Sequence, residues 1–177
     1  MVHYRRNRVP GATYFFTVTL HDRRSDVLVR YVHMLREAWH VARRRIPHEV
    51  VAVVVLPDHL HAVLTLPENF ENYSRLWQEI KKGFTRRLIL SGVAIPRTAN
   101  NELKLWQRRF WEHTIRSDRD LEAHVAYAHF NPVKHGYVQR VQDWPHSSFH
   151  RYVRMGLLSV DWATQPEQLQ ISHEEVD

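Results

Sequence analysis

The chain has 177 residues, a formal net charge of +6 at pH 7 and a pI of about 9.9. Hydrophobic residues make up 44% of it, which is enough for a sizeable core and excludes wholesale disorder. The chain contains no cysteine, which excludes disulfide frameworks, thiolate zinc sites and cysteine nucleophiles. No apolar stretch approaches the ~20 residues of a membrane helix, and the first residues lack an apolar signal region. We therefore expect a cytoplasmic globular protein without a membrane partner.

Charge is segregated along the chain. Basic residues concentrate in residues 1–45 and 71–116, whereas residues 46–70 contain no Lys or Arg. Two basic blocks favour a polyanionic partner, because neutralised phosphates release counterions. Charge alone is equally consistent with a solvated basic surface. Aromatic residues interleaved with arginines over 106–111 favour single-stranded nucleic acid, since they could also stack unpaired bases.

The spacing of apolar residues predicts an alternation of strands and helices. In chain order we expect a strand over 14–20, a helix from about 25 to 45, strands over 50–56 and 59–66, a helix over 73–88, a strand over 105–115 and a helix over 117–131. The first six elements match the ferredoxin-like, or RRM-like, α+β plan. In that plan the helices cover one face of an antiparallel sheet, and the other face is free for a ligand.

A C-terminal extension follows the last predicted helix, so we expect one domain over residues 1–156. Residues 157–177 contain five acidic residues and no Lys or Arg, which predicts an acidic tail. Two hypotheses fit this tail: it folds back over the basic surface and competes with DNA, or it is a disordered solubilising segment.

A histidine pair lies at the start of the predicted strand over 59–66. Strand alternation puts His59 and His61 on one face, where two imidazoles can share a divalent ion. The pair alone is weak evidence in a chain with 14 histidines. The absence of Lys and Arg over 46–70 favours a metal, since fixed cations nearby would oppose it.

The predicted helix over 117–131 carries further candidates. Tyr127 and Asn131 are four residues apart, so they are neighbours on one polar stripe of the helix. If this stripe packs along the edge of the histidine strand, Asn131 could be a third metal ligand and Tyr127 a nucleophile. In the alternative, the tyrosine hydroxyl bonds locally and the asparagine caps the helix before Pro132.

Together these residue types suit phosphoryl transfer. A phenol is a poor nucleophile at neutral pH, since its pKa is ordinarily ~10. A divalent metal can position a phosphate and offset the charge that develops on its oxygens. Attack by Tyr127 would give a covalent phosphotyrosine and split one difficult step into two. Two histidines and an amide suit Mn²⁺ or Mg²⁺, and the ligands alone do not choose between them.

Several extended motifs occur in a fixed order: Gly11-x-x-Tyr14-Phe15-Phe16-Thr17, Leu56-Pro57-Asp58-His59-Leu60-His61, Trp106-Gln107-Arg108-Arg109-Phe110-Trp111-Glu112-His113, Tyr127-x-His129-x-Asn131-Pro132-Val133-Lys134-His135-Gly136 and Trp144-Pro145-x-Ser147-Ser148. On these motifs, from about Arg5 to Trp162, the chain resembles the REP-associated tyrosine transposases. That family is a branch of the single-tyrosine HUH transposases, named for their His–hydrophobic–His motif.

The resemblance implies an enzyme that nicks and rejoins single-stranded DNA at hairpin-forming REP elements. It implies that His59 and His61 are the HUH ligands and that Tyr127 becomes linked to a 5′-phosphate, leaving a free 3′-OH. Asn131 occupies the position of a polar metal ligand that is often Gln in related transposases. The resemblance also implies a host-domesticated protein. Related insertion-sequence transposases are dimers, but for this branch we expect a monomer that needs no small-molecule cofactor.

Binding residues are proposed from their chemistry and position. Basic residues before the first strand, on one helix face and on the aromatic strand are candidates for phosphate contacts, and a tryptophan is a candidate for base stacking. These candidates are Arg5, Arg6, Arg8, Lys82, Arg86, Trp106, Arg108 and Arg109. For each cation the alternative is a solvated side chain.

Two other functions fit part of the pattern. A non-catalytic module could bind single-stranded nucleic acid on an RRM-like sheet, with its aromatic residues and arginines as a stacking platform. A metal-dependent hydrolase could activate water and would not need Tyr127.

Overall fold

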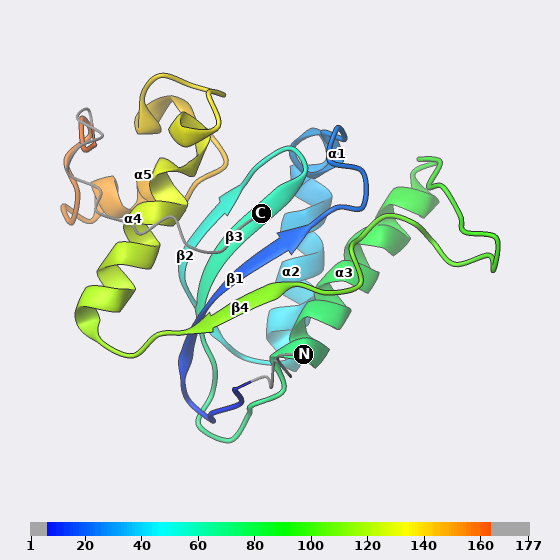
Figure 1. The fold of residues 1–177 in the computed structure, drawn as a ribbon, viewed down its shortest axis with the longest axis horizontal. Helices are drawn as coiled ribbons and strands as arrows, with labels where there is room; N and C mark the ends of the chain where they lie inside the picture. Colours follow the sequence, from blue (N-terminus) through cyan, green and yellow to red (C-terminus); the bar gives the residue numbers. More distant parts are fainter. Residues whose placement is uncertain (1–6, 164–177) are drawn as a thin grey trace, which may run out of the picture.

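Four antiparallel strands form the centre of the protein, in the order β2-β3-β1-β4 (Figure 1). The computed structural model describes residues 7–163. The strands are β1 (Thr13–Thr19), β2 (Glu49–Val55), β3 (His59–Thr65) and β4 (Trp111–Thr114). The helices are α1 (Val27–Arg30), α2 (Val32–Arg45), α3 (Tyr73–Leu90), α4 (Asp118–Lys134) and α5 (Phe149–Arg154), with a short 3-10 turn, η1 (Val141–Asp143). The predicted ferredoxin-like α+β plan is confirmed.

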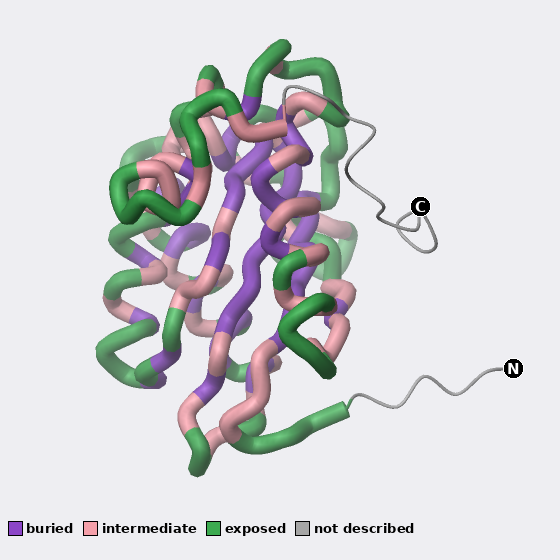
Figure 2. The backbone as a smooth tube through the Cα atoms, turned by 90° about the vertical axis from the view of Figure 1, so that its left-hand side faces the viewer, coloured by how far each residue is buried: buried purple, intermediate pink, exposed green. Residues whose placement is uncertain are grey.

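The two faces of the sheet are both buried over much of their area. Tyr14 and Phe16 of β1 belong to the core under α2 and α3, on the face where helices were expected. Phe15 points to the opposite face, where it shares a second core with Val125 and Ala128 of α4. This face was expected to be free for a ligand, but α4 covers part of it because its apolar residues need a partner surface. Figure 2 shows the resulting burial along the central strands.

Two predicted helix boundaries are wrong. The helix expected from about residue 25 to 45 is interrupted at Tyr31, whose φ of −116° and ψ of 33° separate α1 from α2. The helix expected to stop near Asn131 continues through Pro132 to Lys134. Proline has no N–H to donate, but the next turn still forms, with the His135 N–H donating to the Asn131 carbonyl at 3.0 Å.

The strand predicted over 105–115 is also too long, since β4 begins only at Trp111. Trp106 forms an isolated bridge with Leu20, and the chain is irregular between these two points. Arg108 and Arg109 are both exposed there. In a regular strand, one of two consecutive arginines would point into the core, and burial of an unpaired charge is costly.

The C-terminal extension closes the free edge of β2. The Val55 N–H donates to the His146 carbonyl at 2.8 Å, and the Ser148 N–H donates to the Val53 carbonyl at 2.8 Å. An open edge strand is a template for aggregation, so this cover protects the sheet. Of the acidic tail predicted over 157–177, residues 164–177 lie outside the described residues. Within residues 7–163, no helix is both long enough and apolar enough to cross a membrane.

His48 ties the end of α2 to the start of β2. The Trp39 Nε1–H donates to His48 Nε2 at 2.9 Å, and His48 Nδ1 lies 2.7 Å from the Ile46 carbonyl oxygen. Because an indole nitrogen can only donate, Nε2 is the acceptor and Nδ1 carries the hydrogen. Burial lowers the pKa of His48, and Arg43 lowers it further, against the opposing effect of the Ile46 carbonyl.

The pKa of His48 predicts a loss of stability in acid. A histidine with a lowered pKa binds fewer protons in the folded state than in the unfolded chain, so stability falls as the pH drops below ~6.5. Between pH 7.5 and 5.5, we expect the free energy of unfolding to drop by up to about 1 kcal/mol more in the native protein than in His48→Gln, because one proton taken up over one pH unit corresponds to about 1.4 kcal/mol. Urea unfolding at the two pH values measures this difference.

The matched control is His33→Gln, which replaces an exposed histidine of α2. It should show the same drop as the native protein. An equal drop in His48→Gln would mean that His48 does not contribute to the pH dependence.

Candidate active site

His59 and His61 lie side by side on the sheet face that α4 partly covers. Their ring centroids are 4.9 Å apart, and the two residues are 4% and 1% exposed. Leu60, between them, points into the opposite core. The arrangement is the one that strand alternation predicts, and it places two imidazoles together in a nearly dry environment.

Each imidazole is oriented by a hydrogen bond at Nδ1. Thr17 of β1 is the neighbour of His61 across the strand pair, and its Oγ1 lies 2.9 Å from His61 Nδ1. Asp58, in the β2–β3 turn, has Oδ1 2.8 Å from His59 Nδ1. Both bonds leave Nε2 as the nitrogen that can bind a further ligand, which is the usual arrangement of metal-binding histidines.

Asp58 is held as a carboxylate at this site. Its burial opposes ionisation, but the hydrogen bond from His59 and the ion pair with Arg23 outweigh that effect and lower its pKa to about 2. A carboxylate accepts but does not donate, so His59 Nδ1 carries the hydrogen and Nε2 has a free lone pair. Asp58 therefore fixes the tautomer of His59 as well as its orientation.

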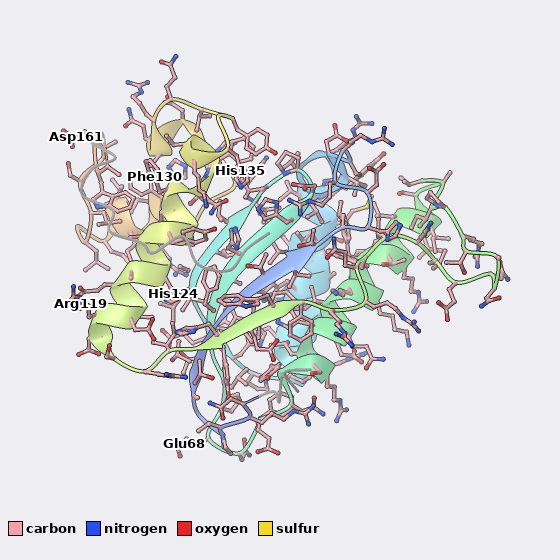
Figure 3. The ribbon with its side chains drawn as sticks, in the orientation of Figure 1. Glu68, Arg119, His124, Phe130, His135 and Asp161 are labelled. Atoms are coloured by element: carbon pink, nitrogen blue, oxygen red, sulfur yellow. The ribbon has the colours of Figure 1, made fainter. Side chains whose placement is uncertain are left out.

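Helix α4 brings Tyr127 and Asn131 to the histidine pair. The ring centroids of Tyr127 and His61 are 5.3 Å apart, and Asn131 is 1% exposed. Phe15 supports both rings from below, with centroids 5.3 Å from His61 and 5.8 Å from Tyr127. In Figure 3, His124 of α4 and His135, the residue that follows the helix, lie on the side of α4 that faces the sheet. The conditional expectation that the polar stripe of α4 meets the histidine strand is thus fulfilled.

Buried polar atoms without partners mark the centre of the site. His61 Nε2 and both amide atoms of Asn131 are buried and have no hydrogen-bond partner among the residues described. Burial and the neighbouring His59 lower the pKa of His61 well below its usual value, and nearby Asn131 offsets part of this lowering. An unsatisfied buried polar group costs about 1–3 kcal/mol. A cation bound between His61 Nε2 and the amide oxygen of Asn131 would satisfy those two atoms, so the residues present fit a metal.

Two residues at the end of α4 belong to the site although the sequence suggested no role for them. Lys134 Nζ lies 3.4 Å from the Tyr127 hydroxyl and 4.9 Å from the ring centroid. The His135 ring is 5.2 Å from that of His59. Burial, His59 and Lys134 lower the pKa of His135. Both residues belong to the motif over 127–136, and this motif was the feature of the sequence that could have indicated their role.

The predicted DNA-binding residues gather elsewhere. Lys82 and Arg86 of α3 line a groove of about 1040 Å³ between this helix and residues 103–110. Its lining also includes Arg8, Trp106 and Arg108. Arg109 is exposed beside the groove but does not line it. Arg5 and Arg6 lie outside the described residues. The groove is on the α3 side of the sheet, away from Tyr127 on the α4 side.

Known proteins similar to this chain share one family name. The REP-associated tyrosine transposase of Escherichia coli (strain K12) is 47% identical over 163 residues, which is 92% of each protein. A Haemophilus influenzae protein named for the same family is 43% identical over 169 residues, covering 94% of this chain and 96% of that protein. A solved structure of a REP-associated tyrosine transposase bound to a REP hairpin has a TM-score of 0.83 and 46% identity, over 93% of each chain. No family model matches the chain.

The fold and these relatives define the class as a tyrosine transposase, an enzyme of DNA rearrangement. At this identity and coverage, the chain belongs to the family of REP-associated tyrosine transposases. The resemblance read from its motifs is confirmed.

The contacts of Asp58 predict a positioning effect on metal binding. Asp58→Asn keeps the size of the side chain but removes the charge that fixes His59. Because outer-shell partners of metal-binding histidines typically affect affinity 10–100-fold, we expect Mn²⁺ affinity, measured by isothermal titration calorimetry, to fall by about that factor.

The control for this measurement is Thr65→Val. Thr65 bonds Thr13 at the far end of the β1–β3 pair, with 2.8 Å between the two hydroxyls. Its loss should leave Mn²⁺ affinity unchanged. Equal affinities in the native protein and Asp58→Asn would exclude Asp58 as a positioning residue.

Proposed function

We propose that this transposase cleaves and rejoins single-stranded DNA at hairpin-forming REP elements through a 5′-phosphotyrosine on Tyr127. His59, His61 and Asn131 would hold Mg²⁺ or Mn²⁺. The observation that carries the proposal is the meeting of the Tyr127 ring with the histidine pair, 5.3 Å from His61, around buried atoms that lack partners.

The substrate class rests on the similar solved structure. That transposase is bound to a REP hairpin and is 46% identical to this chain over 93% of it. The groove beside α3 supports a nucleic-acid partner independently, because cations and an aromatic ring line it together. We infer that the groove binds the DNA and that the histidine face carries out the reaction.

A divalent metal is implied by the family, and the donor set of this chain suits one. Two imidazoles and an amide oxygen leave coordination positions free, as Mg²⁺ and Mn²⁺ sites commonly do. When bound, the metal would supply positive charge that polarises the scissile phosphate. Asp58 and Thr17 keep the two Nε2 atoms turned toward this position.

Tyr127 would act as the nucleophile. The phenolic oxygen forms a bond to phosphorus while the bond from phosphorus to the 3′ oxygen breaks. The phenol loses its proton, and the departing 3′ oxygen gains one to become the 3′-OH. The Lys134 ammonium, 3.4 Å from the hydroxyl, stabilises negative charge that develops on the attacking oxygen. Rejoining reverses the step: an incoming 3′-OH attacks the phosphotyrosine and releases Tyr127.

Removal of the nucleophile tests the reaction class. Tyr127→Phe lacks the hydroxyl but keeps the ring that packs on Phe15. We expect cleavage of a REP-type single strand with Mn²⁺ to fall by at least 10³-fold, since a covalent route is lost. The denaturation-resistant protein–DNA adduct should disappear, and DNA affinity should stay within about twofold. Gel electrophoresis of labelled DNA, with peptide mapping of the adduct, measures all three.

The other two functions give different results in the same assay. A hydrolase that activates water would keep most of its activity in Tyr127→Phe and would never form an adduct. A non-catalytic binding module would show no cleavage in either protein. The matched control is Tyr31→Phe, because Tyr31 packs against the core on the α2 and α3 side of the sheet. It should cleave at the native rate.

Removal of two cations tests the groove. The slope of log affinity against log salt should become shallower by about 1 for each cation that no longer binds a phosphate, so Lys82→Ala with Arg86→Ala should reduce it by about 2. Fluorescence anisotropy over a series of salt concentrations measures the slope.

The matched control is Arg44→Ala, an exposed α2 arginine that does not line the groove. This control should leave the slope nearly unchanged. If both proteins keep the native slope, the groove is not the DNA-binding surface.

A further inference from the structure

A second cluster of metal-ligating side chains lies on the α4 side of the sheet. His113 of β4 and Asp120 and His124 of α4 each offer one ligand atom, and these atoms all lie within 4.8 Å of one another. His113 Nε2 is 2.9 Å from Asp120 Oδ2, and His124 Nδ1 is 2.9 Å from both Asp120 Oδ1 and the Asp120 carbonyl oxygen. Within residues 7–163, no other group of three or more His, Cys, Asp or Glu side chains comes this close.

Local structure brings the three side chains together. Ser117 caps α4 and accepts from the Asp120 N–H at 3.2 Å, while Asp120 Oδ2 accepts from the Arg116 N–H at 2.9 Å. These two bonds fix the carboxylate near the first turn. His124 follows Asp120 by four residues, so it lies on the same face of the helix. His113 points to this face, and its ring stacks on that of His124 at 4.5 Å and 15°.

The cluster is separate from the histidine pair. The Phe15 ring lies between them, with its centroid 5.3 Å from that of His61 and 4.9 Å from that of His124. The two groups share no ligand atom, and each has its own histidines. All three residues of the cluster are half-buried, so solvent reaches it and could complete a coordination shell.

We propose that His113, Asp120 and His124 form a second metal site, which takes a divalent transition metal of the Zn²⁺ type. Two imidazoles and one carboxylate are ligand types that Zn²⁺ shares with other borderline ions. A bound metal would replace the hydrogen bonds of Asp120 with His113 and His124, and the carboxylate would still have a lone pair for the Arg116 N–H. Figure 3 shows Arg119 projecting away from the side of α4 that carries His124.

Such a site would fasten the start of α4 to β4. The helix packs mainly on β2 and β3, and the cluster joins it to the opposite edge strand. Tyr127 follows His124 by three residues, about one helical turn. A metal at the cluster therefore fixes the helix one turn before the nucleophile, and this role does not depend on a metal at the histidine pair.

Zinc binding in the full chain tests the site, with His61→Gln as the background so that the histidine pair is impaired. Isothermal titration calorimetry should find one Zn²⁺ per chain. Zn²⁺ at 100 times its Kd should raise the melting temperature by about 5–10 °C. With Co²⁺ as a second probe, visible absorption should appear on binding. Adding His124→Gln, or in a separate protein His113→Asn, should weaken Zn²⁺ binding at least tenfold and abolish the Co²⁺ absorption.

The control on the same background is His33→Gln, an exposed α2 histidine, which should keep full binding. Absence of Zn²⁺ binding in His61→Gln would overturn the proposal. So would binding that survives both cluster substitutions, or that His33→Gln weakens equally, because either result indicates surface histidines. Mn²⁺ binding by His124→Gln alone reports on the histidine pair, so failure of one site is distinguishable from failure of the other.

Discussion

The packing of α4 across the sheet is the interaction on which the site depends. Val125 and Ala128 bury their side chains against Val54 and Val63, and this contact sets the height of the helix above β3. Ala128 is small enough for the helix to approach the strands closely. Tyr127, the residue before it, is thereby brought over the histidine pair. The proposed catalytic geometry is a consequence of apolar packing, because no hydrogen bond between described residues joins Tyr127 to a histidine.

This packing also has a cost in folding free energy. It buries His61 Nε2 and the Asn131 amide without partners, and each such group costs about 1–3 kcal/mol. Burial of one large apolar side chain contributes a similar amount, so the core under α4 can offset the unsatisfied atoms. Buried groups left without partners are rare in folded proteins and typical of functional sites. A bound cation would turn this local cost into binding energy.

Periodicity predicted the parts of the site that depend on one element alone. Strand alternation placed His59 and His61 together, and helical spacing did the same for Tyr127 and Asn131. Periodicity could not predict contacts between different strands and helices. The bond of Thr17 to His61 depends on the register of β1 with β3, which no local pattern reveals.

The sequence patterns also failed to predict two features of helix α4. Its covered face mixes apolar residues with buried His129 and Asn131, so its apolar stripe did not show how much of the sheet it would cover. Lys134 was missed because the helix was expected to end at Pro132. A proline at that point removes one donor, and the packed helix tolerates the loss.

The two faces of the sheet also constrain how one DNA strand could reach both the groove and Tyr127. The groove lies on the α3 side and the histidine pair on the α4 side. Residues 146–148 close the β2 edge, whereas β4 is the other edge and pairs with β1 alone among the strands described. If the groove binds DNA as proposed, a strand that leaves it can pass around β4, where Arg108 and Arg109 are exposed. The irregular segment before β4 would then contribute to DNA binding, because it exposes both Arg108 and Arg109 to solvent, whereas a regular strand would expose only one of them.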